Sequence, residues 1–403
     1  MSKGKGGPLN YNLPNSIMVV GTNTRPIVKS AKSIGMRTIA VDGFGDLDLR
    51  RYADTVYSPK TPKPEGPGRG RDLLIKSLSI LEKHEVDAVL LSSGTEHWPG
   101  LIKRIKEKID VIGNKETQIG TCTAKKRLFT AANKIGIPTP STRRVSEVED
   151  ALEFADEAGY PVLLKPSFGG GGIGIRIASS PDRVLANFSE VLSSGNGRSA
   201  YVQKYIKGID ASTSVLSNGE RAQCLTVNEQ IVGDARLGVP RPLGYCGNVL
   251  PLEKNGELSS KLAEFSEALC EELGLVGSNG VDFVVSDRPY LVEVNPRFQG
   301  TIDCVEGVLG INLVEKHIEA CRGELGDYKK PEGYSIKLIL YAKEDMVAPD
   351  LDDLPVVDVP MPGSSVKKGS PLCSILKFGN SRKKLVQEAY RTAEKIYRFV
   401  QTT

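Results

Sequence analysis

Two hydrophobic periods alternate over the first quarter of the chain. Short apolar runs at 16–21 (SIMVVG), 37–42 (RTIAVD) and 86–94 (VDAVLLSSG) are typical of buried strands. Segments between such runs, for example 72–84 (DLLIKSLSILEKH), space their apolar residues three and four apart, as an amphipathic helix does. Strands that alternate with helices form open parallel sheets with helices on both faces. Residues 16–113 are therefore predicted to form an N-terminal α/β domain.

The pattern after residue 113 predicts antiparallel strands mixed with helices. The expected helices are 123–137, 146–158, 182–194, 258–274 and 311–322, and the expected strands include 160–167, 173–178, 200–206 and a hairpin at 281–295. The turn GIPTP at 136–140 cannot continue a helix and predicts a hinge. The overall prediction is an α/β protein whose central domain, 114–330, is α+β and carries a mobile lid at about 138–205. A small C-terminal α+β domain at 331–403 follows.

Composition mainly excludes classes of protein. A chain of 403 residues suggests two or three domains. The net charge of +4 is too mild to indicate nucleic-acid binding. Seven irregularly spaced Cys and three His argue against a disulfide framework and a zinc site. No apolar run reaches the roughly 18 residues of a membrane span, and residues 1–15 lack the apolar core of a signal peptide. We expect a cytoplasmic protein that binds neither nucleic acid nor membrane.

Two turns in the N-terminal part carry weaker signals. Residues 21–25 read GTNTR rather than GxGxxG, so no dinucleotide site is expected there. Residues 59–70 (PKTPKPEGPGRG) hold four Pro and three Gly, a composition that predicts a mobile loop. A basic clamp over a substrate is the alternative interpretation of this segment.

The strongest local signal is KPSFGGGGIG at 165–174, where five glycines in six residues join two predicted strands. Backbone N–H groups in such a loop can approach a polyphosphate closely, and Lys165 can neutralise a phosphate. The spacing is not that of a P-loop, and a strand rather than a helix follows. A phosphate-binding flap is favoured over a plain flexible hairpin.

A second signal lies in the hairpin at 281–295. Glu293 and Asn295 are two residues apart and leave the same face of a strand, and Asp282 can face them from the partner strand. Two carboxylates and an amide oxygen suit Mg²⁺, which takes phosphate oxygens and waters as its remaining ligands. Arg297, two residues further on, could hold the charge of a transferred phosphoryl group. An ordinary exposed polar face is the alternative.

Lys125, the glycine loop, QKYIKG at 203–208 and LVEVNPRFQG at 291–300 together resemble the ATP-grasp superfamily over about residues 16–345. Within it the chain is most similar to archaeal predicted ATP-dependent carboligases related to biotin carboxylase. The resemblance implies a nucleotide site made of Lys125, Lys165, Gly169, Gly170, Gly171, Gly172, Gly174, Gln203, Lys204, Tyr205, Ile206 and Asp210. It also implies Mg²⁺, as two ions that Mn²⁺ can replace, on Asp282, Glu293 and Asn295, with Arg297 and Lys165 as catalytic residues. Asp210 and Asp282 stand where Glu is commoner in the family.

The activity that the resemblance implies is an ADP-forming ligation. A small-molecule carboxylate would be activated as an acyl phosphate and joined to an amine, in the synthesis of a cofactor or metabolite. Ile339 stands where the similar stretch of biotin carboxylase has an arginine for bicarbonate and biotin, which argues against bicarbonate chemistry. A bicarbonate-using carboxylase and a non-catalytic nucleotide-binding module stay open as alternatives, and so does a homodimer.

Glu96, Arg236 and Arg241 are weaker candidates for contacts with the substrate. Glu96 follows the predicted strand at 86–94, and the carboxyl ends of strands in open sheets face the ligand. Alternatively, Glu96 and Ser93 cap the next helix. Arg236 and Arg241 could grip a carboxylate through two hydrogen bonds, or they could lie in a solvated loop.

Overall fold

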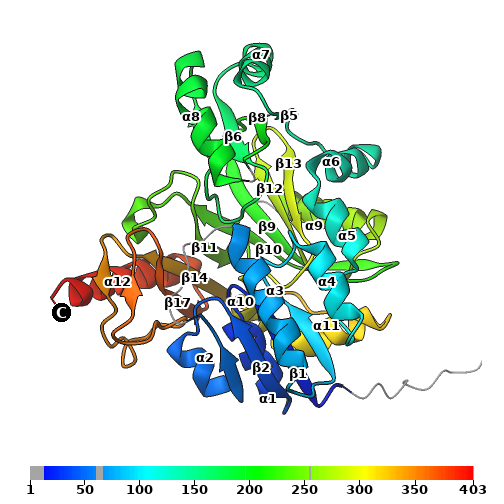
Figure 1. Ribbon diagram of the computed structural model, residues 1–403, viewed down its shortest axis with the longest axis vertical. Helices are drawn as coiled ribbons and strands as arrows, with labels where there is room; N and C mark the ends of the chain where they lie inside the picture. Colours follow the sequence, from blue (N-terminus) through cyan, green and yellow to red (C-terminus); the bar gives the residue numbers. More distant parts are fainter. Residues whose placement is uncertain (1–12, 60–66, 196, 254–255, 403) are drawn as a thin grey trace, which may run out of the picture.

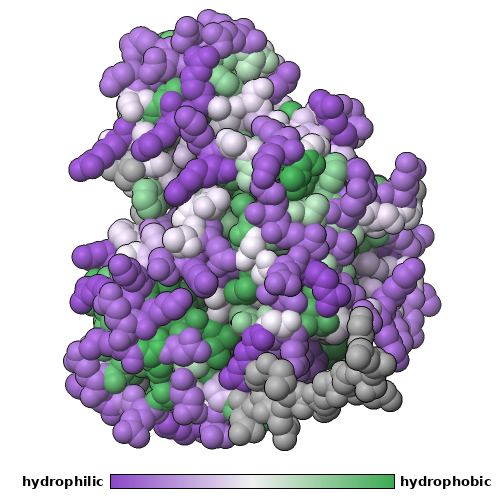
Figure 2. All heavy atoms as spheres, turned by 90° about the vertical axis from the view of Figure 1, so that its right-hand side faces the viewer, coloured by the Kyte–Doolittle hydropathy of each residue, from purple (hydrophilic) through white to green (hydrophobic). Residues whose placement is uncertain are grey.

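The computed structural model describes residues 13–59, 67–195, 197–253 and 256–402. Figure 1 shows an upper lobe with α7 and α8, an N-terminal sheet at the bottom, and a large sheet that links both to the C-terminal helix α12 on the left. The face on the right-hand side of Figure 1 is mostly hydrophilic, above all over the upper lobe (Figure 2). Within the described ranges, no helix is both long and apolar enough to cross a bilayer.

The N-terminal sheet is parallel, as predicted, and its strands lie in the order β3-β2-β1-β4. The strands are β1 (Ser16–Gly21), β2 (Arg37–Asp42), β3 (Thr55–Tyr57) and β4 (Ala88–Leu91), and the helices are α1 (Arg25–Ser33), α2 (Leu47–Tyr52), α3 (Pro67–Leu81) and α4 (Pro99–Lys106). Alternation along β1 sends Ile17 and Val19 toward α1, whereas Met18 and Val20 pack in the cluster that contains α3 and α4. Both faces of the sheet are therefore buried.

Two local expectations in this part were incomplete or wrong. Helix α2 was not predicted, because six residues are too few to show a helical period. Residues 60–66 of the predicted loop lie outside the described residues, but Pro67–Gly70 already form the first turn of α3. Proline is tolerated there, and Gly70 lets the helix approach Gly94, whose carbonyl oxygen would lie 1.7 Å from a Cβ at position 70. The glycine serves packing rather than mobility.

The upper lobe is a small antiparallel sheet covered by two helices. Its strands run in the order β5-β8-β6-β7. They are β5 (Thr142–Val145), β6 (Val162–Pro166), β7 (Arg176–Ala178) and β8 (Ala200–Lys204), and the helices are α7 (Val148–Ala158) and α8 (Pro181–Ser194). The buried side chains of this lobe form a cluster of their own, from Val145 to Val202. The lobe coincides with the predicted lid; that it moves stays a prediction.

A seven-stranded antiparallel sheet, in the order β13-β12-β9-β10-β11-β14-β17, forms the centre of the molecule. Its strands are β9 (Ile209–Asn218), β10 (Ala222–Val232), β11 (Tyr245–Leu250), β12 (Val276–Val285), β13 (Pro289–Asn295), β14 (Tyr334–Tyr341) and β17 (Pro371–Gly379). Strands β14 and β17 belong to the segment predicted as a C-terminal domain, so the sheet crosses the boundary expected at 330/331. That boundary stays a prediction.

The remaining elements connect or cover this sheet. They are α5 (Glu116–Thr123), α6 (Lys125–Lys134), the 3-10 helix η1 (Ala235–Leu237), α9 (Gly256–Glu272), α10 (Ile302–Leu309), α11 (Leu313–Cys321), the short strands β15 (Met346–Val347) and β16 (Ser365–Val366), and α12 (Arg382–Thr402). Helices α6 and α9 pack in one buried cluster with β9, β12 and β13. Helix α12 packs with β14 and β17 in another.

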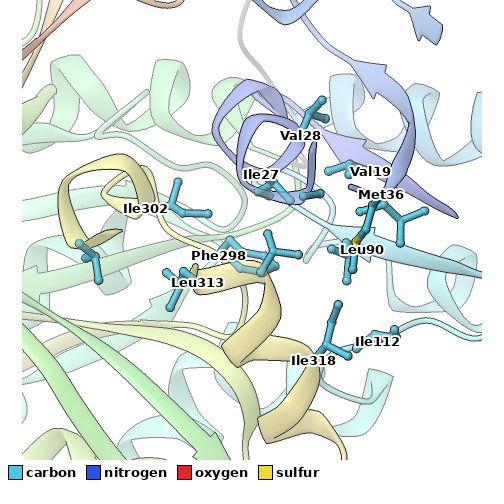
Figure 3. Close-up of a cluster of buried hydrophobic side chains, with 14 of the residues drawn as sticks. Val19, Ile27, Val28, Met36, Leu90, Ile112, Phe298, Ile302, Leu313 and Ile318 are labelled. Carbon is cyan, nitrogen blue, oxygen red and sulfur yellow. The ribbon is translucent and has the colours of Figure 1, made fainter. Parts of the chain in front are cut away.

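The N-terminal sheet is fixed to the central part by a shared core. Figure 3 shows Val19, Ile27 and Leu90 of the N-terminal part facing Phe298 and Leu313 of the central part. A buried ion cluster reinforces this contact. The guanidinium of Arg25, only 1% exposed, lies 2.6 Å from the Asp303 carboxylate and 2.8 Å from that of Asp358. These contacts bring the loop after β4 close to the loop after β13.

Candidate active site

A cavity of about 300 Å³ lies between the upper lobe and the seven-stranded sheet. Twelve of the predicted site residues line it: Lys165, Gly171, Gly172, Gln203, Lys204, Tyr205, Ile206, Asp210, Asp282, Glu293, Asn295 and Arg297. They come from segments more than a hundred residues apart in the chain. The cavity wall does not include Lys125, Gly169, Gly170, Gly174, Glu96, Arg236 or Arg241.

The predicted pairing of Asp282 with Glu293 is observed: the two residues are direct partners in the β12–β13 ladder. Asp282 accepts hydrogen bonds from Asn295 (Nδ2–Oδ2 3.0 Å) and from Gln230 (Nε2–Oδ1 3.1 Å). Burial and the neighbouring Glu293 carboxylate raise the pKa of Asp282 well above its usual value. Burial acts in the same direction on Glu293, but Lys125 and Lys165 lower its pKa overall.

These two carboxylates have the donor chemistry for a hard divalent cation. Their mutual repulsion would be relieved by a bound cation, and carboxylate oxygens are the ligands that Mg²⁺ prefers. Within the described part of the chain, no cluster of three or more His, Cys, Asp or Glu could hold a metal ion. The remaining ligands would therefore have to be an amide oxygen, water or the oxygens of a phosphate. The residues fit Mg²⁺ on that condition.

Two lysines face the carboxylates. Lys125 begins α6, donates to the carbonyl oxygen of Val292 (2.7 Å) and lies 3.9 Å from the Glu293 carboxylate. Lys165, the last residue but one of β6, donates to Oε1 of Gln203 at 3.4 Å. Burial, with the nearby charge of Lys125, lowers the pKa of Lys165 to about 8. Burial lowers the pKa of Lys125 as well, so a bound anion would stabilise the charged form of both lysines.

The glycine loop lies against the loop that precedes β11. The carbonyl oxygen of Gly171 accepts a hydrogen bond from the backbone N–H of Tyr245 (3.3 Å). Gly172 has a φ of +77°, and a Cβ on it would lie 1.9 Å from the carbonyl oxygen of Leu243. Only glycine fits this position. The loop also contacts the N-terminal part, because the Phe168 ring lies 5.4 Å from that of His97.

The segment predicted to hold adenine and ribose follows the end of β8 into β9. The side chain of Gln203 is fully engaged, since it accepts from Lys165 and donates to Oγ1 of Thr142 (2.8 Å). Lys204 and the next two residues line the cavity. Burial raises the pKa of Asp210 to about 6. The arrangement leaves the backbone of this segment and the Asp210 carboxylate beside the cavity.

Arg297 lies two residues beyond the end of β13, where a turn keeps its guanidinium at Asn295 (Nη2–Oδ1 3.0 Å). Both Nε and Nη2 of Arg297 lie 3.1 Å from Oε1 of Glu96. Burial opposes the charge of Glu96, but Arg297 and His97 lower its pKa overall. The alternative role of Glu96 as a helix cap is wrong, because Trp98 is the N-cap of α4. The sequence gives no signal for the contact between Glu96 and Arg297.

The other two weak candidates do not line the cavity. Arg236 is ion-paired with Asp234 (2.6 Å) and stacks on the ring of Tyr390 at 4.0 Å. It lines a separate cavity of about 480 Å³ beside α12. Arg241 lies 6.0 Å from the ring of Tyr341. Both arginines lie in a Gly- and Pro-rich loop without hydrophobic periodicity, so the sequence does not indicate on which side of the sheet their guanidinium groups lie.

Sequence reasoning missed the uncharged polar side chains that complete the cavity. Ser212, Gln230, Tyr245, Asn248, Gln299 and Thr301 all line it. One signal was available: Asp210, Ser212 and Ser214 are spaced two apart along β9 and share a face.

A family model described as "ATP-grasp domain" matches residues 122–301. This part of the chain is an ATP-grasp domain. The match spans the upper lobe, β9 to β13 and every cavity residue named above. The predicted resemblance to the ATP-grasp superfamily is thereby confirmed.

Similarity to known proteins extends beyond the residues that the family model matches. An uncharacterized protein of Methanocaldococcus jannaschii is 27% identical over 376 residues, which are 93% of this chain and 90% of the relative. The carbamoyl phosphate synthase large chain of Clostridium botulinum is 25% identical over 336 residues, 79% of this chain but only 30% of that protein.

The solved structure of the biotin carboxylase domain of Hydrogenobacter thermophilus 2-oxoglutarate carboxylase, in complex with MgADP and bicarbonate, has 19% identity and a TM-score of 0.72. The match covers 94% of this chain and 89% of that domain. The predicted fold class is therefore confirmed.

Proposed function

We propose that this chain is an ATP- and Mg²⁺-dependent ligase that activates a small-molecule carboxylate as an acyl phosphate and joins it to an amine. One observation carries the proposal: Lys165 and the Asp282–Glu293 carboxylate pair line one cavity with the glycine loop, and a second lysine, Lys125, lies 3.9 Å from Glu293. Phosphoryl transfer requires cations that bind the phosphates, carboxylates that hold a divalent metal, and backbone N–H groups that contact the phosphate oxygens.

ATP would lie along the cavity. Its adenine would lie against Lys204–Ile206, its ribose beside Asp210, and its phosphates under the glycine loop between Lys125 and Lys165. The pKa of Lys165, lowered to about 8 by burial and by Lys125, supports this arrangement, because a bound polyphosphate would restore the favourable charge of both lysines. We also propose domain boundaries at 113/114 and 330/331, and a homodimer.

Asp282, Glu293 and the amide oxygen of Asn295 would hold Mg²⁺, and Mn²⁺ would substitute for it. When bound, the cation would neutralise charge on the phosphate oxygens. In the described conformation the Asn295 amide donates to Asp282 through its nitrogen, and its oxygen accepts from Arg297, so the amide would have to turn over to bind the cation.

The residues of this chain would act mainly by position and charge. An oxygen of the substrate carboxylate would attack the γ-phosphorus while the bond from that phosphorus to the bridging oxygen of ADP breaks. Lys165 and Arg297 would stabilise the negative charge that spreads over the transferred group. The nitrogen of the amine would then attack the acyl carbon, phosphate would leave, and the nitrogen would lose a proton. No side-chain nucleophile is needed.

A bicarbonate-using carboxylase is the second candidate, and the similarity to a biotin carboxylase domain over 94% of the chain favours it. Ile339 speaks against it. This residue lies on β14 opposite Ser374 and packs, partly buried, at the edge of an apolar cluster. The apolar side chain of Ile339 provides no charge that could bind bicarbonate.

The deciding experiment measures ADP release in carbonate-stripped buffer. We expect release to need a metabolite carboxylate and to be indifferent to added bicarbonate. Hydroxylamine should trap the acyl phosphate as a hydroxamate, and an amine should convert slow release into stoichiometric amide and phosphate. Bicarbonate-dependent turnover without a hydroxamate from any acid would overturn the ligase and favour the carboxylase.

A further inference from the structure

The floor of the cavity next to the carboxylate pair consists of uncharged polar side chains. Strand β9 leads to it from the proposed ribose end, because Asp210 is the ladder partner of Val284, Ser212 of Asp282 and Ser214 of Gly280. Ser212 therefore lies beside the carboxylate pair and Ser214 beyond it. The substrate that accepts the phosphoryl group would occupy this end, away from the adenine segment.

Ser212, Tyr245 and Asn248 of this floor belong to a hydrogen-bond network on β9, β10 and β11, which continues behind the cavity wall to Asn228 and Ser214. Asn248 donates to Oγ of Ser212 at 3.1 Å, and the hydroxyl of Tyr245 donates to Oδ1 of Asn248. Asn228 also donates to Ser212, at 3.4 Å. Ser214 extends the network to Thr301 at 3.3 Å. Asn228 and Asn248 are at most 1% exposed, so their rotamers are fixed by packing.

This network has hydrogen-bonding capacity that its own members do not use. Ser212 Oγ accepts from two amides, so its hydrogen is free to be donated. The Tyr245 hydroxyl donates its hydrogen, so its oxygen can still accept. Oδ1 of Asn228 has no hydrogen-bond partner among the described residues. A buried network left one or two partners short is completed by a ligand or by water.

Charge at the cavity wall is concentrated elsewhere. The charged residues that line it within the described ranges are Lys165, Lys204, Asp210, Asp282, Glu293 and Arg297. The proposed function assigns five of these to nucleotide, metal or phosphoryl group, and Lys204 belongs to the adenine segment. Arg297 is already paired with Glu96. An ionised substrate group on the floor would be desolvated without a counter-charge, whereas an uncharged polar group would be hydrogen-bonded.

We propose that Ser212, Tyr245 and Asn248 bind an uncharged hydroxyl or carboxamide group of the acid, so that the substrate is a hydroxy or amido carboxylic acid. This inference rests on the proposed ligase function. It also gives Tyr245 a second task, because its backbone N–H bonds the lid glycine Gly171 (3.3 Å). A group that orders the Tyr245 side chain would thereby support the closed position of the glycine loop.

The test is the hydroxamate assay with ATP, Mg²⁺ and short carboxylic acids grouped on shared carbon skeletons. Within each group the far position carries a hydroxyl, carboxamide, ammonium, carboxylate or methyl group. For the wild-type chain we expect the hydroxyl or carboxamide member to have the highest kcat/KM, by about tenfold or more over the ammonium and carboxylate members.

Two variants make the test specific to the floor. Asn248→Asp should shift the ratio of kcat/KM for the ammonium over the hydroxyl member upward by about tenfold. Ser212→Ala should cost the hydroxyl member about tenfold more than the methyl member. Asn380→Asp, the same exchange at an exposed residue outside the cavity, should leave all ratios unchanged. Calorimetric ATP binding reports that each variant keeps a folded nucleotide site.

Preference of the wild-type chain for a charged member would overturn the inference, and so would ratios that neither variant changes. Failure of the proposed function has a different signature. In that case the wild-type chain would form no hydroxamate with any member of any group, while still binding ATP.

Discussion

Asp282 and Glu293 are direct cross-strand partners in one hairpin, and their pKa values are shifted in opposite directions. Like charges placed directly opposite each other destabilise a sheet, so the fold keeps this pair at a cost. Lys125, 3.9 Å from Glu293, explains why Glu293 keeps its charge while Asp282 has the raised pKa. A carboxylate pair whose pKa values are shifted apart beside a cavity is a candidate functional site by physical criteria.

Removing one charge of this pair should slow the reaction strongly and leave the fold intact. Glu293→Gln keeps the shape of the side chain, and we expect turnover at limiting Mg²⁺ to fall on the order of 100-fold. Thermal unfolding should change little, because the like-charge repulsion with Asp282 disappears. Glu257→Gln, in the exposed first turn of α9, is the matched control. Near-normal turnover of Glu293→Gln at limiting Mg²⁺ would mean that the cation is held elsewhere.

The affinity for ATP should depend on the charge of Lys165. Because its pKa is lowered to about 8 in the free protein, the ammonium form is complete below that pH and is lost as the pH rises through it. We therefore expect the Kd for ATP, measured by calorimetry, to increase above pH 8.

Two substitutions at the same position test this dependence on pH. Lys165→Arg stays charged and should flatten the pH profile. Lys165→Ala should weaken binding by roughly 10- to 100-fold at neutral pH. An equally steep profile in Lys165→Arg would assign the titration to another group.

The glycine loop should tolerate a side chain at one position and not at another two residues away. Gly172→Val would bring Cβ to 1.9 Å from the Leu243 carbonyl at a φ of +77°, so the loop could not adopt its described position. Turnover should be lost, and nucleotide should no longer protect the loop from chymotrypsin, which cleaves after Phe168. Gly170→Val is the control, because its Cβ would meet nothing within 4 Å. Equal nucleotide protection in both variants would show that closure does not need this approach.

Arg25 should be the main electrostatic determinant of stability. Burial alone would raise the pKa of Asp358, but Arg25 and Lys337 hold this pKa well below its usual range. Arg25→Met would leave the buried Asp303 carboxylate without its close counter-charge and Asp358 with Lys337 alone, and we expect a loss of about 3–5 kcal/mol in the free energy of unfolding by urea.

The exposed pair Lys32–Asp54 gives a control, since Lys32→Met should have almost no effect. The ionised Asp358 carboxylate contributes its full stabilisation when the pH is above the pKa that this group has in the unfolded chain. This stabilisation is lost as the pH falls through the lowered pKa of Asp358 in the folded protein. The difference between wild type and Arg25→Met should therefore shrink in acid. A constant difference down to acidic pH would contradict the assignment to this ion pair.

The predictable parts of the site are those with a local signal. The glycine loop and the alternation of Glu293 and Asn295 are properties of neighbouring residues, and the structure brings both to one cavity. The parallel N-terminal sheet was likewise predictable, because its buried strands are short apolar runs. Helix α2 was not, since six residues show no period.

Contacts between distant segments had no sequence signal. Glu96 and Arg297 are 201 residues apart, and Arg236 turns toward α12 rather than the cavity because the course of its loop depends on packing against Tyr390. In the sequence, the floor residues Ser212 and Asn248 look like ordinary polar residues of strands. They are neighbours only because of the order of the strands in the sheet. Local periodicity cannot determine that order.

The order of strands in the seven-stranded sheet has a consequence for synthesis of the chain. Strand β11 ends at Leu250, but its neighbour β14 begins only at Tyr334. The ribosome therefore releases β11 with one row of backbone hydrogen-bonding groups unpaired, and such open edges invite pairing with other chains. Arg25 likewise lacks its partner Asp358 until 333 more residues have been synthesised. A nascent chain would need protection from aggregation until its last segment emerges.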